Sequence, residues 1–147
     1  ELPEAFDFRI AGEDRVLGHD VWIISATPKP GYQPQRRDAK PLTKIKGRLW
    51  VEKAGYQWVR VEAETTDTIS FGLFLARLNP GAHLVFEQTR INDEVWLPKR
   101  IFVSGTGRLA LIKKIAMDQE VSWSNYRKFH VDSTVVLSGA SVPTQHE

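Results

Sequence analysis

The strongest constraint on the fold is a pair of alternating segments near the middle of the chain. Residues 44–52 (KIKGRLWVE) and 56–64 (YQWVRVEAE) both alternate apolar with polar side chains. A period of two is typical of β-strands, because successive side chains point to opposite faces of a sheet. The intervening residues 53–55 (KAG) include a glycine that suits a tight turn. The sequence therefore predicts a β-hairpin over residues 44–64.

Alternation also assigns the side chains of this hairpin to two faces. One face is interpreted as core and is predicted to carry the aliphatic residues Ile45, Leu49, Val51, Val59, Val61 and Ala63. The other is predicted to combine aromatic with charged residues, namely Trp50, Tyr56 and Trp58 with Arg48, Arg60, Glu62 and Glu64. Aromatic side chains seldom line a face that is open to water, so we expect something to cover this second face.

Further segments have strand character and are separated by turn signals. They are residues 5–10, 20–26, 83–91, 94–103 and 120–131. Pro98 lies inside one of them and indicates an edge or a bulge, because proline cannot donate to the ladder. Short strands that alternate with turns favour a meander of hairpins over a βαβ arrangement. We expect a mainly β domain with minor α content, built on a curved antiparallel sheet.

Two apolar segments, residues 69–78 and 108–117, fit a helix and a strand about equally, since short apolar runs are not resolved by periodicity. The first is also a candidate lid, because Gly72 would weaken a helix there by roughly 1 kcal/mol. The polar residues 32–41 are predicted to form an exposed excursion. Residues 104–107 (SGTG) are predicted to form a tight connection.

Length and composition favour one domain over residues 1–147, with a tail over residues 133–147. The first residue is Glu1, so we expect the C-terminal part of a longer precursor that has lost its signal peptide. No run reaches the roughly 20 apolar residues that span a bilayer, so no transmembrane segment is expected. The net charge is only +2, and no basic cluster falls on one predicted face, so nucleic acid is not an expected partner.

The sequence contains few signals of a catalytic or metal-binding site. The chain has no cysteine, which removes thiol catalysis and thiolate metal sites. None of the four histidines has a metal-binding spacing, and His19 and His130 are interpreted as surface groups near turns. Glu62 and Glu64 are interpreted as a charged strand face that pairs with Arg48 or Arg60. We therefore expect a protein that is not an enzyme and that binds no cofactor or metal.

Large aromatic side chains are more informative. Two interpretations stay open for them, core packing or the lining of a concave apolar groove that accepts an acyl chain. The candidate ligand-binding residues are Trp22, Trp50, Trp58, Phe71, Phe74, Phe86, Trp96 and Phe102. An acyl chain needs few polar contacts, because each buried methylene contributes about 0.8 kcal/mol.

Three stretches, taken in order, resemble a known family. They are DVWIISATPKPGYQP (residues 20–34), GRLWVEKAGYQWVRVEAE (residues 47–64) and NDEVWLPKRIFV (residues 92–103). The order is similar to that of the bacterial outer-membrane lipoprotein-sorting or lipoprotein-carrier-like superfamily, and it covers roughly residues 6–131. Members of that family usually begin with helical sequence, which is absent from this chain.

The resemblance implies a half-open antiparallel β-barrel in the periplasm or elsewhere in the bacterial cell envelope. It also implies a non-catalytic protein that binds acyl chains or lipidated proteins in an apolar concave groove, as in lipoprotein sorting and transport. The alternative is a protein-interaction or structural module. In that case a missing N-terminal segment or a partner subunit, including a second copy of the chain, would cover the apolar face.

Overall fold

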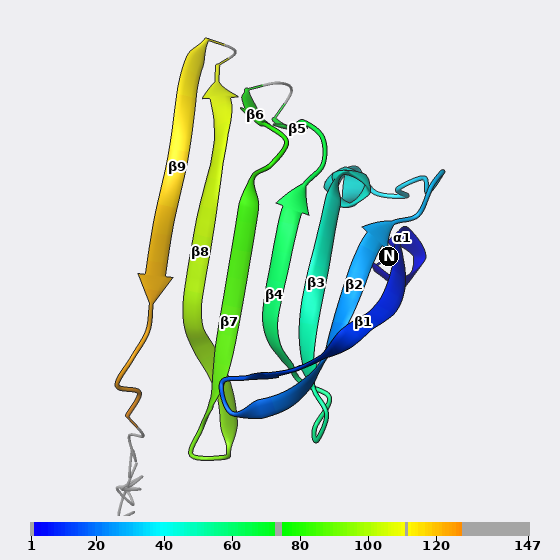
Figure 1. The fold of residues 1–147 in the computed structure, drawn as a ribbon. Helices are drawn as coiled ribbons and strands as arrows, with labels where there is room; N and C mark the ends of the chain where they lie inside the picture. Colours follow the sequence, from blue (N-terminus) through cyan, green and yellow to red (C-terminus); the bar gives the residue numbers. More distant parts are fainter. Residues whose placement is uncertain (1, 73–74, 111, 128–147) are drawn as a thin grey trace, which may run out of the picture.

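The computed structural model describes residues 2–72, 75–110 and 112–127, and this part of the chain is mainly β. Its elements are α1 (Leu2–Ala5), β1 (Phe6–Val16), β2 (His19–Pro28), the 3₁₀-helix η1 (Arg37–Lys44), β3 (Ile45–Glu52), β4 (Trp58–Thr65), β5 (Ile69–Phe71), β6 (Ala76–Leu78), β7 (His83–Ile91), β8 (Val95–Leu109) and β9 (Lys113–Ser122). The strands form one antiparallel sheet that is curved and not closed, which confirms the predicted half-open architecture (Figure 1).

The order of the strands is a meander with one small addition. Strands β1, β2, β3, β4, β7 and β8 follow one another across the sheet, and β9 lies outside β8 (Figure 1). The short hairpin β5–β6 pairs with β8 beyond the end of β7. Sequence neighbours therefore pair almost throughout, as the turn signals predict.

The predicted hairpin over residues 44–64 is confirmed as β3 and β4, but part of its face assignment is wrong. The register shifts between Trp50 and Val51, so that Val51 lies opposite Trp58 and not opposite Val59. A bulge of this kind moves every later side chain to the other face. Trp58 therefore shares a face with Val51, and Val59 packs with Trp50.

One face of the sheet, here called the apolar face, carries apolar side chains from edge to edge. Its central cross-strand row reads Ile10, Ile24, Leu49, Val61, Phe86, Ile101 and Val121. The next row reads Phe8, Ala26, Gly47, Ala63, Leu84, Val103 and Gln119. Seven neighbouring strands thus present an almost unbroken apolar surface on this side.

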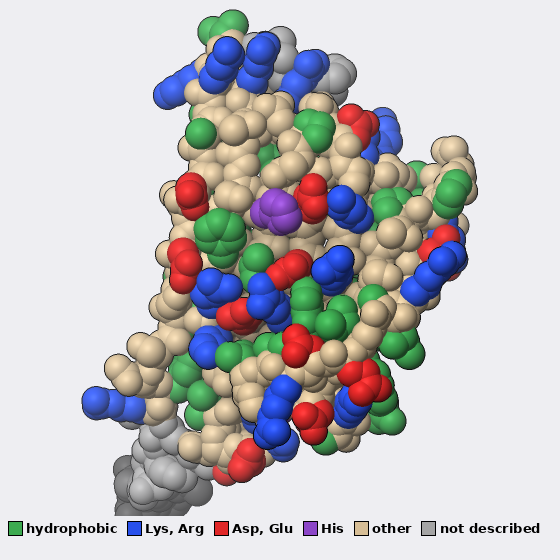
Figure 2. Space-filling view, viewed as in Figure 1, with side chains coloured by type: hydrophobic (Ala, Val, Ile, Leu, Met, Phe, Trp, Pro, Cys, Tyr) green, Lys and Arg blue, Asp and Glu red, His purple; other side chains and the backbone are tan. Residues whose placement is uncertain are grey.

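The opposite face, here called the charged face, carries charge at its centre. One of its rows reads Ile23, Trp50, Arg60, Glu87, Arg100 and Ser122. The neighbouring row reads Arg9, Ser25, Arg48, Glu62, Val85, Phe102 and Glu120. Figure 2 shows basic and acidic side chains side by side at the centre of the molecule.

The hairpin β1–β2 folds over one end of the charged face and covers it (Figure 1). Four strand spacings separate β2 from β8, or about 19 Å along a flat sheet, yet the rings of His19 and Trp96 lie only 5.1 Å apart. Beneath this hairpin Val21, Trp50 and Val59 form a buried cluster. The expected cover over the mixed aromatic face is therefore, at this end, a segment of the chain itself.

The buried core is small for a domain of this size. A second cluster, of Ala5, Phe6 and Ala26, lies on the apolar face under α1 and η1. Among the described residues only Val21 and Val59 are large side chains that are fully buried. Most of the apolar face consequently lacks a packing partner in the described part of the chain.

In the described residues, both ambiguous segments contain parts of two strands. Residues 69–78 contain the strands β5 and β6 and so are neither one helix nor one strand. Residues 108–117 contain the end of β8 and the start of β9. Apolar residues on both sides of a short turn produce one continuous apolar run, which hides the turn.

Other predicted boundaries are wrong as well. Residues 104–107 lie within β8 and make no tight connection. A Cβ at Gly107 would lie 2.2 Å from the carbonyl oxygen of Arg77, so glycine here permits close strand approach. Residues 32–41 are mostly exposed, as predicted, although the segment ends inside η1, where Ala39 is buried. Within the described residues, the predicted strand over residues 120–131 ends at Ser122.

Candidate functional site

A groove of about 370 Å³ lies on the apolar face. The hairpin β5–β6 forms one side of it, and the sheet forms its floor. Its apolar lining comprises Pro41, Ile45, Ala63, Ile69, Phe71, Leu78, Ala82, Leu84, Val103 and Met117. Three of these side chains stay well exposed, because Phe71 is 49% exposed and Leu84 and Met117 are each 39% exposed. The groove thus offers apolar surface that the described residues do not cover.

The groove also has four polar residues in its lining, namely Glu64, Thr65, His83 and Ser104. Glu64 and His83 border a second hollow, of about 380 Å³, on the charged face. The Nε2 atom of His83 lies 3.8 Å from Oε2 of Glu64. Lys46 holds the same carboxylate oxygen at 3.2 Å. The side chains of Glu64 and His83 alternate with Ala63 and Leu84, so the ion pair lies on the charged face, behind the floor of the groove.

The eight aromatic candidates do not share one site. Trp22, Trp58 and Phe86 lie on the apolar face, where the rings of Trp58 and Phe86 are 5.1 Å apart. Trp50 is buried under the β1–β2 hairpin, and Trp96 packs against that cluster.

The remaining three aromatic candidates also differ in their surroundings. Phe102 lies on the charged face. Phe71 lines the groove, and Phe74 lies outside the described residues. The other apolar lining residues come from eight elements and from the turn before β7, and none of them was a predicted ligand-binding residue. The sequence feature that the strand residues among them share is the period-two alternation of their strands, which places them on one face of the sheet.

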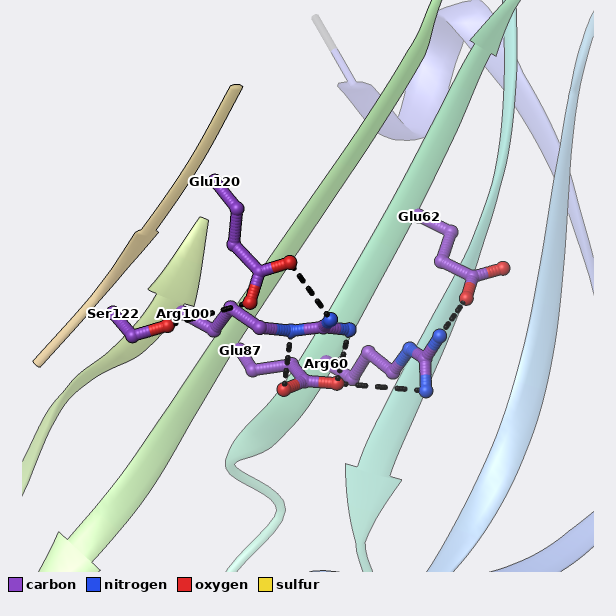
Figure 3. Close-up of polar contacts among 6 residues, drawn as sticks. All are labelled: Arg60, Glu62, Glu87, Arg100, Glu120 and Ser122. Carbon is purple, nitrogen blue, oxygen red and sulfur yellow. Dashed lines mark hydrogen bonds and ion pairs between the residues drawn. The ribbon is translucent and has the colours of Figure 1, made fainter. Parts of the chain in front are cut away.

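Charge is concentrated in a network at the centre of the charged face (Figure 3). Glu87, which is only 7% exposed, lies between two guanidinium groups. Its Oε2 atom is 3.2 Å from Nε of Arg100, and its Oε1 atom is 3.5 Å from Nη1 of Arg60. Arg60 also pairs with Glu62, and Arg100 lies 3.6 Å from Glu120. The guanidinium of Arg60 stacks 5.1 Å from the ring of Trp50.

These contacts confirm that Glu62 and Glu64 take part in ion pairs, with one change of partner. Glu62 pairs with Arg60 on its own strand, and Glu64 pairs across the hairpin with Lys46. Both carboxylates thus belong to charge networks. Among the described residues, no group of three metal-binding side chains comes together.

His19 lies in a shallow hollow, with a carboxylate beside it. Its Nδ1 atom is 3.3 Å from Oε2 of the buried Glu52. The hollow is otherwise lined by Gly18, Asp20, Lys53 and Ala54, so none of its lining residues supplies a hydroxyl nucleophile. His130, which lies two residues before Asp132 in the sequence, is outside the described residues.

No protein-family model, no curated protein and no solved structure matches this chain. In the described part of the chain, no helix is long and apolar enough to cross a membrane. The resemblance to the lipoprotein-carrier-like superfamily stays a prediction.

Proposed function

We propose that this domain is a non-catalytic binding protein of the bacterial cell envelope, located in the periplasm, that holds an acyl chain or the lipidated end of a protein in its apolar groove. Lipoprotein sorting or transport would be a role of this kind. The observation that carries the proposal is the groove of about 370 Å³, whose apolar side chains stay exposed. This volume falls in the usual range of ligand sites, about 300 to 1,000 Å³.

The chemistry of the groove suits a hydrocarbon chain. Its apolar lining is aliphatic or aromatic, and the side chains of Glu64 and His83 belong to the other face of the sheet. Burial of eight methylenes contributes about 6 kcal/mol, at about 0.8 kcal/mol each, before the cost of immobilising the chain. A carrier needs an affinity of this kind, which depends on length rather than on specific hydrogen bonds.

Displacement of a fluorescent fatty acid tests this proposal. In Leu84→Lys a charge enters the groove at a side chain that is already 39% exposed, so we expect at least about tenfold weaker binding. Phe8→Lys is the matched control, because Phe8 lies on the same face, is 46% exposed and does not line the groove. It should change the affinity less than about twofold.

Native mass spectrometry of protein from a bacterial host supplies a second measurement. We expect a bound species with the mass of a fatty acid or phospholipid. The absence of any such species, together with no displacement of the fluorescent probe, would remove the proposal. Equal losses in Leu84→Lys and Phe8→Lys would move the binding site away from the groove.

One observation favours a second candidate function, that of a protein-interaction module. Exposed apolar side chains extend well beyond the groove, since Ile10 is 71% and Val121 is 50% exposed. Contiguous apolar surface of this extent is typical of protein interfaces. A partner subunit or a second copy would then cover the face, and light scattering over a concentration series would show association. A strictly monomeric protein that binds the fluorescent fatty acid would favour the carrier.

A further inference from the structure

Positive charge collects at the end of the molecule where β8 turns into β9. Arg77 on β6 lies opposite Arg108 on β8, and Arg108 lies opposite Lys114 on β9. Residues 68–82 and 105–117 together contain no acidic residue. Their four basic residues are Arg77, Arg108, Lys113 and Lys114. Figure 2 shows basic side chains gathered at this end of the molecule.

Arg108 has a basic residue opposite it on the strand at each side. Like charges that face each other on neighbouring strands destabilise a sheet. Here two such pairs are consecutive, and both involve Arg108. The cost is offset when an anionic surface lies against the row. This row of basic residues could not be predicted from the sequence, because its members come from three strands and 30 residues of chain separate Arg77 from Arg108.

Exposed aliphatic side chains lie at the same end. Leu75, in the turn between β5 and β6, is 68% exposed, and Ile112, in the turn before β9, is 85% exposed. The two turns are joined, because the N–H of Ala110 donates to the carbonyl of Leu75 at 2.6 Å. Phe71 and Leu109 nearby are also exposed, at 49% and 42%. This end of the molecule, here called the tip, therefore carries the exposed side chains of Leu75 and Ile112, and the basic residues lie directly behind them.

We propose that this end of the molecule docks on the surface of an anionic lipid bilayer. Aliphatic side chains at the tip match the boundary of the acyl region, and basic side chains behind them match anionic headgroups. A soluble polyanion such as a nucleic acid would account for the charge but not for Leu75 and Ile112. Phe71 and Leu78 of the same hairpin line the groove, so docking would hold the groove beside a source of acyl chains.

Co-sedimentation of the full chain with vesicles tests the proposal. We expect binding to phosphatidylcholine vesicles that contain phosphatidylglycerol, weakening as salt increases, and little binding to phosphatidylcholine alone. The triple variant Arg108→Gln, Lys113→Gln, Lys114→Gln should bind about 100-fold more weakly, at roughly fivefold for each charge. The matched control Arg36→Gln, Arg37→Gln, Lys40→Gln removes the same formal charge near η1 and should lose less than about fivefold.

A second pair of variants tests the apolar part of the contact. The double variant Leu75→Ser, Ile112→Ser should bind at least about tenfold more weakly. Val95→Ser, at the other end of β8, removes an aliphatic side chain that is 47% exposed and should leave binding unchanged. Because all these side chains are exposed, circular dichroism should show the wild-type fold in every variant.

Several outcomes would overturn the proposal. They are no binding to anionic vesicles, equal binding to neutral vesicles, equal losses in a variant and its control, or retention on heparin without vesicle binding. The measurement is independent of the acyl-chain proposal, since the vesicle assay follows the protein and the displacement assay follows a ligand in the groove. Binding of vesicles without displacement of the fatty acid would support docking and contradict the carrier function.

Discussion

Strand β7 shows the contrast between the two faces of the sheet within four residues. On the charged face, Val85 is 9% and Glu87 is 7% exposed. On the apolar face, Leu84 is 39% exposed. Antiparallel sheets usually bury their apolar face and leave the polar face in water. The reversed pattern shows that the described chain uses its own β1–β2 hairpin and long side chains to cover charge, while apolar surface stays open.

The charged face tolerates burial because its charges compensate one another. Glu87 faces two guanidinium groups, and one of them also stacks on Trp50. A buried charge without such partners would cost several kcal/mol. Most of the apolar face has no cover among the described residues, and its exposed aliphatic surface costs free energy until another molecule covers it.

The largest effect is expected from Glu87→Gln, which keeps the shape of the side chain and removes its charge. Arg60 and Arg100 would then face each other without the carboxylate between them. We expect the free energy of unfolding to fall by about 2 to 3 kcal/mol, below the value for fully buried pairs because both arginines are partly exposed. Urea denaturation measures the loss.

Glu13→Gln is the control for this prediction. Glu13 pairs with Lys53 at 2.6 Å but is 64% exposed at its side chain. Exposed ion pairs contribute little, so the loss should stay below about 1 kcal/mol. Equal losses in the two variants would mean that Glu87 is hydrated, and the contrast between the faces would fail.

Val59 and Val61 permit a comparison of the two faces with one substitution on one strand. Val59→Ala removes methyl groups from a fully buried side chain and should cost about 2 kcal/mol. Val61→Ala removes the same groups from a half-buried side chain of the apolar face and should cost less than about 1 kcal/mol. Urea denaturation again measures both. A larger loss in Val61→Ala would show that the apolar face is covered in solution.

Local chemistry explains which parts of the fold could be predicted from the sequence. The turn at Asn92 and Asp93 was predictable, because both residues take positive φ angles, 51° and 55°, which Asn and Asp tolerate. The bulge beside Pro98 was also predictable, and the register does shift there. The bulge between Trp50 and Val51 has no such signal, since neither glycine nor proline lies at that position.

The candidate sites were less predictable, for a different reason. The groove combines residues as distant in sequence as Pro41 and Met117, and the basic row at the tip combines three strands. Their assembly depends on register and on where β5–β6 joins β8, neither of which appears in local patterning. The aromatic candidates were chosen for the size of their side chains. The property that distinguishes Phe71 and Leu84 is the exposure of their side chains in the groove, which only the fold reveals.

The smallest effect is expected at Asp67, an exposed carboxylate that serves as a reference for the buried Glu87. The N–H of Thr68, which donates to Oδ1 at 2.6 Å, and then Lys44 at 3.2 Å hold the pKa of Asp67 below its usual value of 3.8. A pKa lowered by folding adds stability above the unfolded value, and that stability is lost as pH falls through the folded value. Asp67→Asn should therefore lower stability slightly at neutral pH and have no effect in strong acid.

NMR titration of the carboxyl carbon of Asp67 in wild type and in Lys44→Gln separates the two causes of the lowered pKa. The pKa should rise only partway in Lys44→Gln, because the N–H of Thr68 still donates to the carboxylate. A full return to the usual value would assign the shift to Lys44 and show that even an exposed charge pair on this molecule outweighs a backbone hydrogen bond.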